Sequence, residues 1–193
     1  MKKINIIYLL PEMKGASGGA KVIYDHSLKL NKLNENISSS VLHLKKKFSY
    51  KVKTSLSKKL NIFKEEYSGW DPNKMRVSKF FSPSKNWFNK NINFKKKFSL
   101  DKDSDFLIIP EIWSHFPEDL KLKKKGINYA IFIQGFFHMN STNNFEKLKS
   151  AYKNAKIIMI SSDYNIRCFK EMFPEFKNKV LRIYLSVDSK KLK

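Results

Sequence analysis

Short apolar runs recur along the chain with helix-like segments between them, and this alternation constrains the fold more than any other feature. Runs of four to eight apolar residues that alternate with helices are typical of a parallel sheet covered on both faces. The sequence therefore predicts an α/β fold, a Rossmann-like, doubly wound parallel sheet. The expected strands are residues 4–10, 37–44, 106–109, 129–133, 157–160 and 180–184, with one more near residues 75–81.

Helix starts are marked by side chains that accept a hydrogen bond from the first turn of a helix. In the first helix we expect Ala20, Ile23, Ser27 and Leu30 to share the buried face. The candidate caps are Ser17 for a helix over residues 18–33, Asn143 or Asn144 for one to residue 152, and Ser162 or Asp163 for one to about residue 172.

The length of 193 residues predicts one domain, residues 1–193. Its middle, about residues 48–100, has weak periodicity and is rich in Lys, Asn, Ser and Phe, which indicates an irregular basic insertion. Two interpretations of its aromatic residues stay open: they lie on the domain surface, or they contact an acceptor or a membrane. The large aromatic residues of this segment include Trp70, Phe80, Phe81, Trp87 and Phe88.

The net charge of +22 raises the question of nucleic-acid binding. The only arginines are Arg76, Arg167 and Arg182, so lysine carries nearly all of the charge. Surfaces that read bases or clamp phosphates usually depend on the bidentate guanidinium group. We therefore expect no specific nucleic-acid partner, and either a compositional bias on solvated surfaces or attraction to an acidic membrane surface.

Other functional classes find little support. The single cysteine, Cys168, allows no disulfide within the chain and fits a reducing compartment. No stretch approaches the 18 apolar residues of a membrane-spanning helix. The four histidines lack paired ligand spacing, and the acidic pair Asp101 and Asp103 lies in a charged linker, so we predict no metal site.

A glycine-rich loop follows the first expected strand and opens the first expected helix. Gly15, Gly18 and Gly19 would allow a phosphate to approach the backbone at the helix N-terminus, where free N–H groups favour an anion. The alternative is a turn that only starts the helix. Ser17 and Ala20 break the dinucleotide pattern, and Val22 stands where a P-loop has Ser or Thr, so neither class is expected.

This strand, loop and helix resemble the start of the GT-B-fold glycosyltransferases, especially the large retaining family that includes bacterial polysaccharide and lipopolysaccharide transferases. Later segments resemble the same family in the same order, although Tyr184-Leu185-Ser186 replaces the usual Pro-Asn-Gly near the end. The matching segments are Pro110-Glu111, Gln134-Gly135, Ser161-Ser162 and Val187-Asp188, each after an expected strand.

The resemblance implies that the chain is the acceptor-side, N-terminal half of a GT-B fold, without the C-terminal domain that binds most of the donor. We expect the chain alone to be inactive until that domain or a partner chain joins it. The implied substrates are a nucleotide sugar and a saccharide or lipid-linked acceptor, with no metal or other cofactor. The enzyme would serve cell-surface polysaccharide or lipid-linked saccharide synthesis, either free in the cytoplasm or bound peripherally at the inner face of the membrane.

The resemblance also implies roles for individual residues. Gly18 and Gly19, with Gly15 beside them, would meet the donor phosphates. His138 and Glu111 are the catalytic candidates, and Gln134 and Gly135 are the substrate-binding ones. For Glu111 a solvated carboxylate is the alternative, and for His138 a surface histidine. The competing function is a basic nucleic-acid- or nucleotide-binding α/β module without transferase activity.

Overall fold

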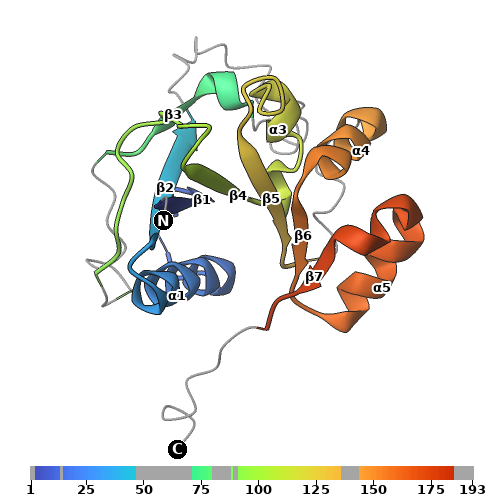
Figure 1. Ribbon diagram of the computed structural model, residues 1–193, viewed down its shortest axis with the longest axis horizontal. Coiled ribbons are helices and arrows are strands. Elements are labelled where there is room, and N and C mark those ends of the chain that lie inside the picture. Colours follow the sequence, from blue (N-terminus) through green and yellow to red (C-terminus); the bar gives the residue numbers. More distant parts are fainter. Residues whose placement is uncertain are drawn as a thin grey trace, which may run out of the picture.

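Seven strands form one sheet in the computed structural model, which describes residues 3–13, 15–46, 71–79, 88, 91–135 and 144–184. The strand order is β3-β2-β1-β4-β5-β6-β7 (Figure 1). All neighbouring strands pair in parallel except β3, which is antiparallel to β2. The strands are β1 Ile4–Pro11, β2 Ile37–Lys46, β3 Met75–Val77, β4 Asp105–Pro110, β5 Asn128–Ile133, β6 Ile157–Ile160 and β7 Val180–Arg182.

The predicted α/β fold class and all seven expected strands are confirmed. Two details of the expectation are wrong. The sheet is not wholly parallel, because β3 returns along β2 in the opposite direction. The last strand ends at Arg182 and not at residue 184, and Tyr184 is 77% exposed, so its aromatic ring adds nothing to the core.

The central strands are buried on both faces, which explains their continuous apolar runs. In β1, the side chains of Ile7 and Leu9 enter the core on one face, and those of Tyr8 and Leu10 enter the core on the other. Burial of a Leu or Ile side chain contributes about 1.5–3 kcal/mol. A strand of this sheet therefore contributes stabilising energy from both of its faces.

Helices cover the two faces unequally (Figure 1). Helix α1, Gly18–Leu33, packs on the face that holds Tyr8 and Leu10. The opposite face carries the remaining α-helices of the described chain: α3 Phe116–Asp119, α4 Phe145–Asn154 and α5 Asp163–Met172. A hydrogen bond of 2.6 Å from the Tyr129 hydroxyl to the Ala151 carbonyl ties α4 to β5.

The helix caps expected from the sequence are confirmed. Ser17, Asn144 and Ser162 precede α1, α4 and α5, and each side chain accepts a backbone N–H bond from the first turn. The buried face of α1 contains Ala20, Ile23, Tyr24 and Ser27, whereas Leu30 is only partly buried. None of the helices in the described ranges has the length and apolar character needed to cross a bilayer.

The described part of the middle segment contributes to the core. Phe88 is 4% exposed, and its ring lies 5.0 Å from that of Tyr24 on α1. Phe94 forms a parallel bridge with Val41 of β2. For Phe88, placement on the surface is therefore wrong; Trp70, Phe80, Phe81 and Trp87 lie outside the described residues.

We predict that Ile131→Ala in β5 lowers the free energy of unfolding by about 2–5 kcal/mol, because Ile131 is fully buried and the change leaves a cavity. Leu33→Ala is the matched control: Leu33 is 72% exposed, so the change should stay within about 0.5 kcal/mol. Urea denaturation of both variants measures this. Equal losses would contradict a core centred on β5.

Candidate functional site

The glycine loop lies where the order of the strands reverses. From β1 the chain passes through α1 to β2 on one side, while β4 pairs with β1 on the other side, with Ile7 beside Leu107. Open α/β sheets bind ligands in the crevice at such a point, outside the carboxyl ends of the strands. The loop from β1 to α1 therefore occupies the expected ligand-binding edge.

Two of the glycines leave open space above the backbone. A side chain added at Gly15 or Gly18 would meet no heavy atom within 4 Å. At Gly19 an added methyl would lie 3.1 Å from the Gln134 Oε1 atom. The N-terminus of α1 is thus open at Gly15 and Gly18 and is in contact with β5 through Gly19.

Gln134 connects three of the strand-end turns. Its side-chain amide donates a hydrogen bond of 3.3 Å to the Gly19 carbonyl of α1. Its own carbonyl accepts bonds of 3.3 Å from the Ser161 hydroxyl and from the Asn165 side-chain amide. The turn after β5 is therefore held between the N-termini of α1 and α5.

Glu111 is a buried carboxyl at the end of β4, and only 7% of its surface is exposed. Its Oε1 atom accepts a hydrogen bond of 3.2 Å from the Gly135 N–H. Burial raises the pKa of this carboxyl, and backbone hydrogen bonds at Glu111, Gln134 and Gly135 act in the opposite direction. The expected alternative of a solvated carboxylate is wrong, because the carboxyl group is enclosed by backbone N–H donors.

Glu111 holds the turn after β5 in position. A carboxyl that accepts bonds from a neighbouring turn fixes the direction of that turn, and so fixes the Gln134 side chain against α1. The Glu111 carbonyl in turn accepts a bond of 2.8 Å from the buried Ser114 hydroxyl. Of the other candidates from the sequence, Gly135 is in this cluster, and His138 lies outside the described residues.

Sequence reasoning missed Asn165 and the pair formed by Asp163 and Arg182. Asn165 is 6% exposed and holds the Gln134 carbonyl from the first turn of α5. The Arg182 guanidinium, at the end of β7, pairs with the Asp163 carboxylate. The cap at Ser162 was a usable signal, because the helix it starts presents its next residues to the same edge.

The three histidines that the structure describes all pack against aromatic side chains. The Nε2 atom of His43 is 2.8 Å from the Tyr24 hydroxyl, and burial lowers the pKa of His43 to about 4, which keeps the ring neutral. His26 stacks on Phe132 with ring centroids 5.6 Å apart. His115 packs edge-on against Phe116. Among the described residues no group of three His, Cys, Asp or Glu side chains is placed to hold a metal ion.

No protein-family model matches the chain, and no curated protein is significantly similar to it. Function therefore has to be argued from the strand-end cluster of Gly18, Gly19, Glu111, Gln134 and Gly135.

We predict that Glu111→Gln becomes more stable relative to the native protein as the pH rises. The folded-state pKa of Glu111 lies above its ordinary value, so its contribution to stability is fully present at low pH and is lost as pH rises through the folded-state pKa. Glutamine stays neutral and keeps an acceptor for the Gly135 N–H. Urea denaturation at about pH 4 and about pH 7 measures the difference in unfolding free energy.

Glu175→Gln is the control of opposite sign. Glu175 is exposed and forms a 2.8 Å ion pair with Lys149, and this partner lowers its pKa. Its contribution is present at neutral pH and is lost on acidification, so Glu175→Gln should lose stability relative to the native protein as pH rises. The same trend in both variants would contradict the buried state of Glu111.

We also predict that Gly18→Ala raises the free energy of unfolding by about 0.4–1 kcal/mol, because alanine restricts the unfolded chain and meets open space in the folded one. Gly19→Ala should raise the free energy of unfolding by a smaller amount, since the new methyl displaces the Gln134 side chain. Thermal or urea unfolding of the two variants checks this order. A larger gain at Gly19 would contradict the contact with Gln134.

Proposed function

We propose that the chain is the acceptor-side, N-terminal half of a GT-B-fold glycosyltransferase that uses a nucleotide sugar. The observation that carries the proposal is the convergence of the Gly18-Gly19 loop, Glu111 and Gln134-Gly135 at the point where the order of the strands reverses. In the sequence these residues belong to three separate motifs, each of which resembles the family.

The first part of the proposed site is the part that would bind the diphosphate of the nucleotide sugar. The N-terminus of α1 presents the backbone N–H groups of Gly18 and Gly19 and the positive end of the helix dipole to a diphosphate. The open space at Gly15 and Gly18 supports close approach of the phosphates to the backbone. Preorganised donors of this kind stabilise the charge that develops on a leaving diphosphate.

In this proposal the turn after β5 contacts the acceptor substrate. Gln134 is partly exposed; Ser161 and Asn165 hold its backbone carbonyl, and the Gly19 carbonyl holds its side-chain amide, so this amide is prepositioned beside the diphosphate site. Prepositioning lowers the entropic cost of aligning two substrates. In this proposal Glu111 keeps that turn in place, and His138 remains the candidate for contact with the transferred sugar or the acceptor proton.

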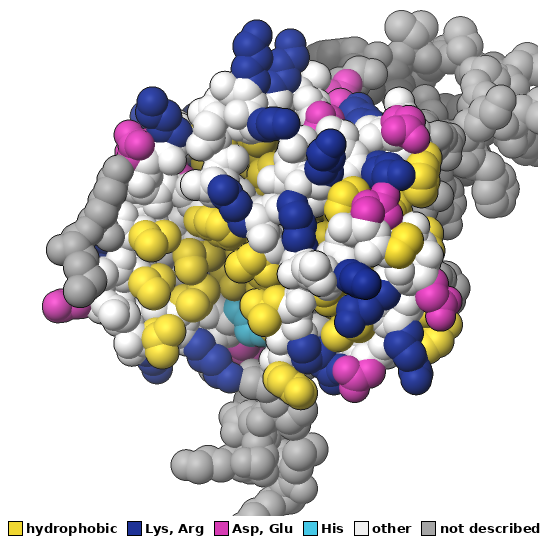
Figure 2. Space-filling model, turned by 45° about the vertical axis from the view of Figure 1, so that its right-hand side comes forward, with side chains coloured by type: hydrophobic (Ala, Val, Ile, Leu, Met, Phe, Trp, Pro, Cys, Tyr) yellow, Lys and Arg dark blue, Asp and Glu magenta, His cyan; other side chains and the backbone are white. Residues whose placement is uncertain are grey.

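The donor-binding carboxylates would come from a second domain or a partner chain, in the cytoplasm. The acceptor would be a saccharide or a lipid-linked saccharide, and the lysine-rich surface would favour an acidic membrane face. On the face shown in Figure 2, Lys and Arg side chains are spread among other groups and do not form the single stripe typical of nucleic-acid-binding surfaces.

The test is a titration of the labelled chain with uridine and guanosine diphosphates, followed by amide chemical shifts. We expect shifts at residues 15–21 and at Gln134 and Gly135. Gly18→Ala should weaken binding by about tenfold or more, a loss of about 1.4 kcal/mol, because its methyl fills the space above the backbone. The fold should persist, since the same variant is expected to be more stable.

Three outcomes would contradict the proposal. Binding that ignores Gly18→Ala would remove the glycine loop from the site. Binding of oligonucleotides that falls steeply with salt, with no response to sugar nucleotides, would favour the nucleic-acid alternative. Release of nucleoside diphosphate from sugar nucleotides by the pure chain would contradict the need for a second domain.

A further inference from the structure

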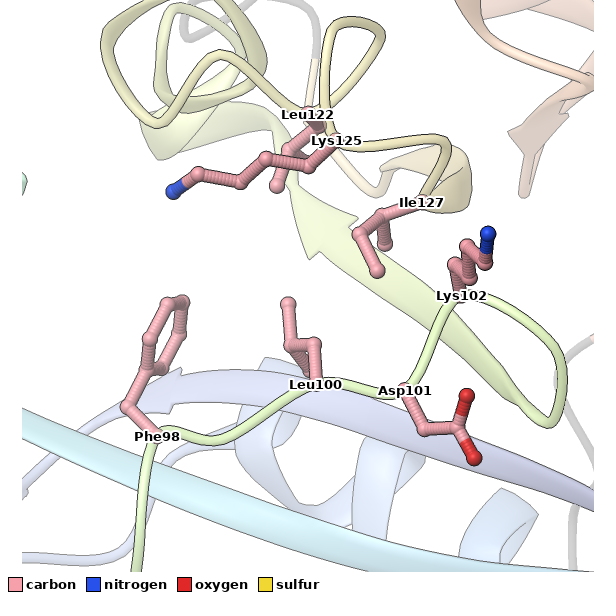
Figure 3. A pocket seen from close by; sticks show the side chains of 7 residues that line it. All are labelled: Phe98, Leu100, Asp101, Lys102, Leu122, Lys125 and Ile127. Atoms are coloured by element: carbon pink, nitrogen blue, oxygen red, sulfur yellow. The ribbon is translucent and has the colours of Figure 1, made fainter.

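A cavity of about 450 Å³ lies at the opposite edge of the sheet, where β4 and β5 begin. This volume falls within the range of about 300–1,000 Å³ that small-molecule sites occupy. Its two walls are the segments that precede these strands. Figure 3 shows Phe98 and Leu100 on the first wall, with side chains directed toward Leu122 and Ile127 on the second.

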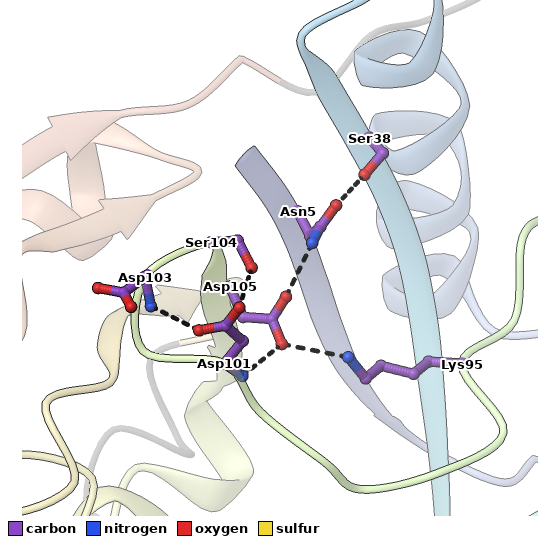
Figure 4. A network of polar contacts seen from close by, with 7 residues as sticks. All are labelled: Asn5, Ser38, Lys95, Asp101, Asp103, Ser104 and Asp105. Atoms are coloured by element: carbon purple, nitrogen blue, oxygen red, sulfur yellow. Dashed lines mark hydrogen bonds and ion pairs between the residues drawn. The ribbon is translucent and has the colours of Figure 1, made fainter. Parts of the chain in front are cut away.

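The first wall is fixed by the buried carboxylate of Asp105, which is 5% exposed. This carboxylate accepts hydrogen bonds from the side-chain amide of Asn5 at 3.0 Å, the Lys95 ammonium at 3.2 Å and the Asp101 N–H at 2.9 Å (Figure 4). The Asp101 carboxylate accepts a bond of 3.0 Å from the Ser104 hydroxyl. The wall is therefore attached to β1 and β4, and its acidic group is occupied within its own turn.

The second wall is a turn with a preset shape. Lys121 has a φ of 54°, in the left-handed region that non-glycine residues seldom adopt, and Gly126 has a φ of 69°. Leu122 is 1% exposed, and its carbonyl accepts the Ile127 N–H at 3.0 Å. A methyl at Gly126 would lie 3.7 Å from the Lys102 Cβ atom, so the two walls are in contact there. Conformations of this kind persist only where the surroundings fix them.

The charge at the cavity is positive. Lys102 and Lys125 line it, and neither forms an ion pair with any residue that the structure describes. In Figure 3 the Lys125 side chain extends along the opening on the side of Phe98, and the Asp101 carboxylate points away from the space between the walls. The cavity thus combines four apolar side chains with the Lys125 ammonium at its opening, while the Lys102 side chain lies on the far side of Ile127.

We propose that this cavity binds a small amphipathic anion, a short alkyl or aryl group that carries a phosphate or carboxylate. The apolar group would lie among Phe98, Leu100, Leu122 and Ile127, where removal of its surface from water favours binding. The anion would meet the Lys125 ammonium at the opening, which acts as a point charge for phosphate, and Lys102 would add to the positive potential from the other side. Because β4 spans about 20 Å at 3.3 Å per residue, this site is separate from the glycine loop.

The test uses hexyl phosphate as the probe, titrated as a monomer into the full chain by calorimetry and by amide chemical shifts. We expect saturable binding, with shifts at residues 98–102 and 122–127. Inorganic phosphate and hexanol should each bind at least about tenfold more weakly, since each lacks one half of the recognition. The same comparison separates a free anion from an anion on an apolar chain.

Two matched double variants test whether hexyl phosphate binding depends on the lysines at the cavity. Lys102→Ala with Lys125→Ala should weaken hexyl phosphate binding about tenfold or more. Lys29→Ala with Lys170→Ala removes the same charge from exposed positions on α1 and α5 and should leave binding unchanged. Phe98→Ala, at a side chain that is 37% exposed and so tolerates the change, should also weaken binding.

Several results would overturn the proposal. One is the absence of saturable binding; another is equal weakening by the two double variants, which would indicate general attraction to a basic surface. Binding to phosphatidylglycerol vesicles without binding of monomeric hexyl phosphate would assign the lysines to a membrane surface and not to the cavity.

Discussion

The parallel pairing of β1 with β4 is the constraint on which the rest of the structure depends. These strands are neighbours in the sheet, although their partners Asn5 and Asp105 are 100 residues apart in the sequence. Their alignment brings the glycine loop and Glu111 to the same edge, and it places the Asn5–Asp105 contact at the other edge. Both sites discussed above therefore depend on one long-range pairing, with polar anchors at the start of the strands and turns at their end.

A single buried carboxyl group organises the candidate site. Glu111 gives up most of its hydration, a cost that is acceptable only because backbone N–H groups surround it. Through the Gly135 N–H it determines where the β5 turn lies, and through Gln134 that position reaches α1 and α5. A polar network in which each member is satisfied gives a unique arrangement. The turn is thus held in place before any ligand arrives.

Most of the fold could be predicted from the sequence, and the contacts within the site only in part. Periodicity gave the strands and caps gave the helix starts, because both signals are local. The antiparallel direction of β3 and the burial of Phe88 depend on contacts across the sheet, which no local pattern encodes. Position after a strand was enough to bring Gly19, Glu111 and Gln134 to one edge. It could not show that Glu111 faces the Gly135 N–H instead of solvent, since that depends on the register of β4 against β5.

The lengths of the outermost strands have a consequence for the behaviour of the protein in solution. An open parallel sheet exposes unpaired N–H and C=O groups at both sides, which can recruit strands from other molecules. The outermost strands β3 and β7 are each three residues long, whereas the inner strands β1 and β2 are eight and ten residues long. β3 pairs only with residues 44–46 of β2, and further along the same side residues 93–95 bond to Val41 and the Asn31 side chain bonds to the Ser39 backbone. Each side of the sheet therefore offers only a short template. The domain therefore carries its own protection against strand-to-strand aggregation.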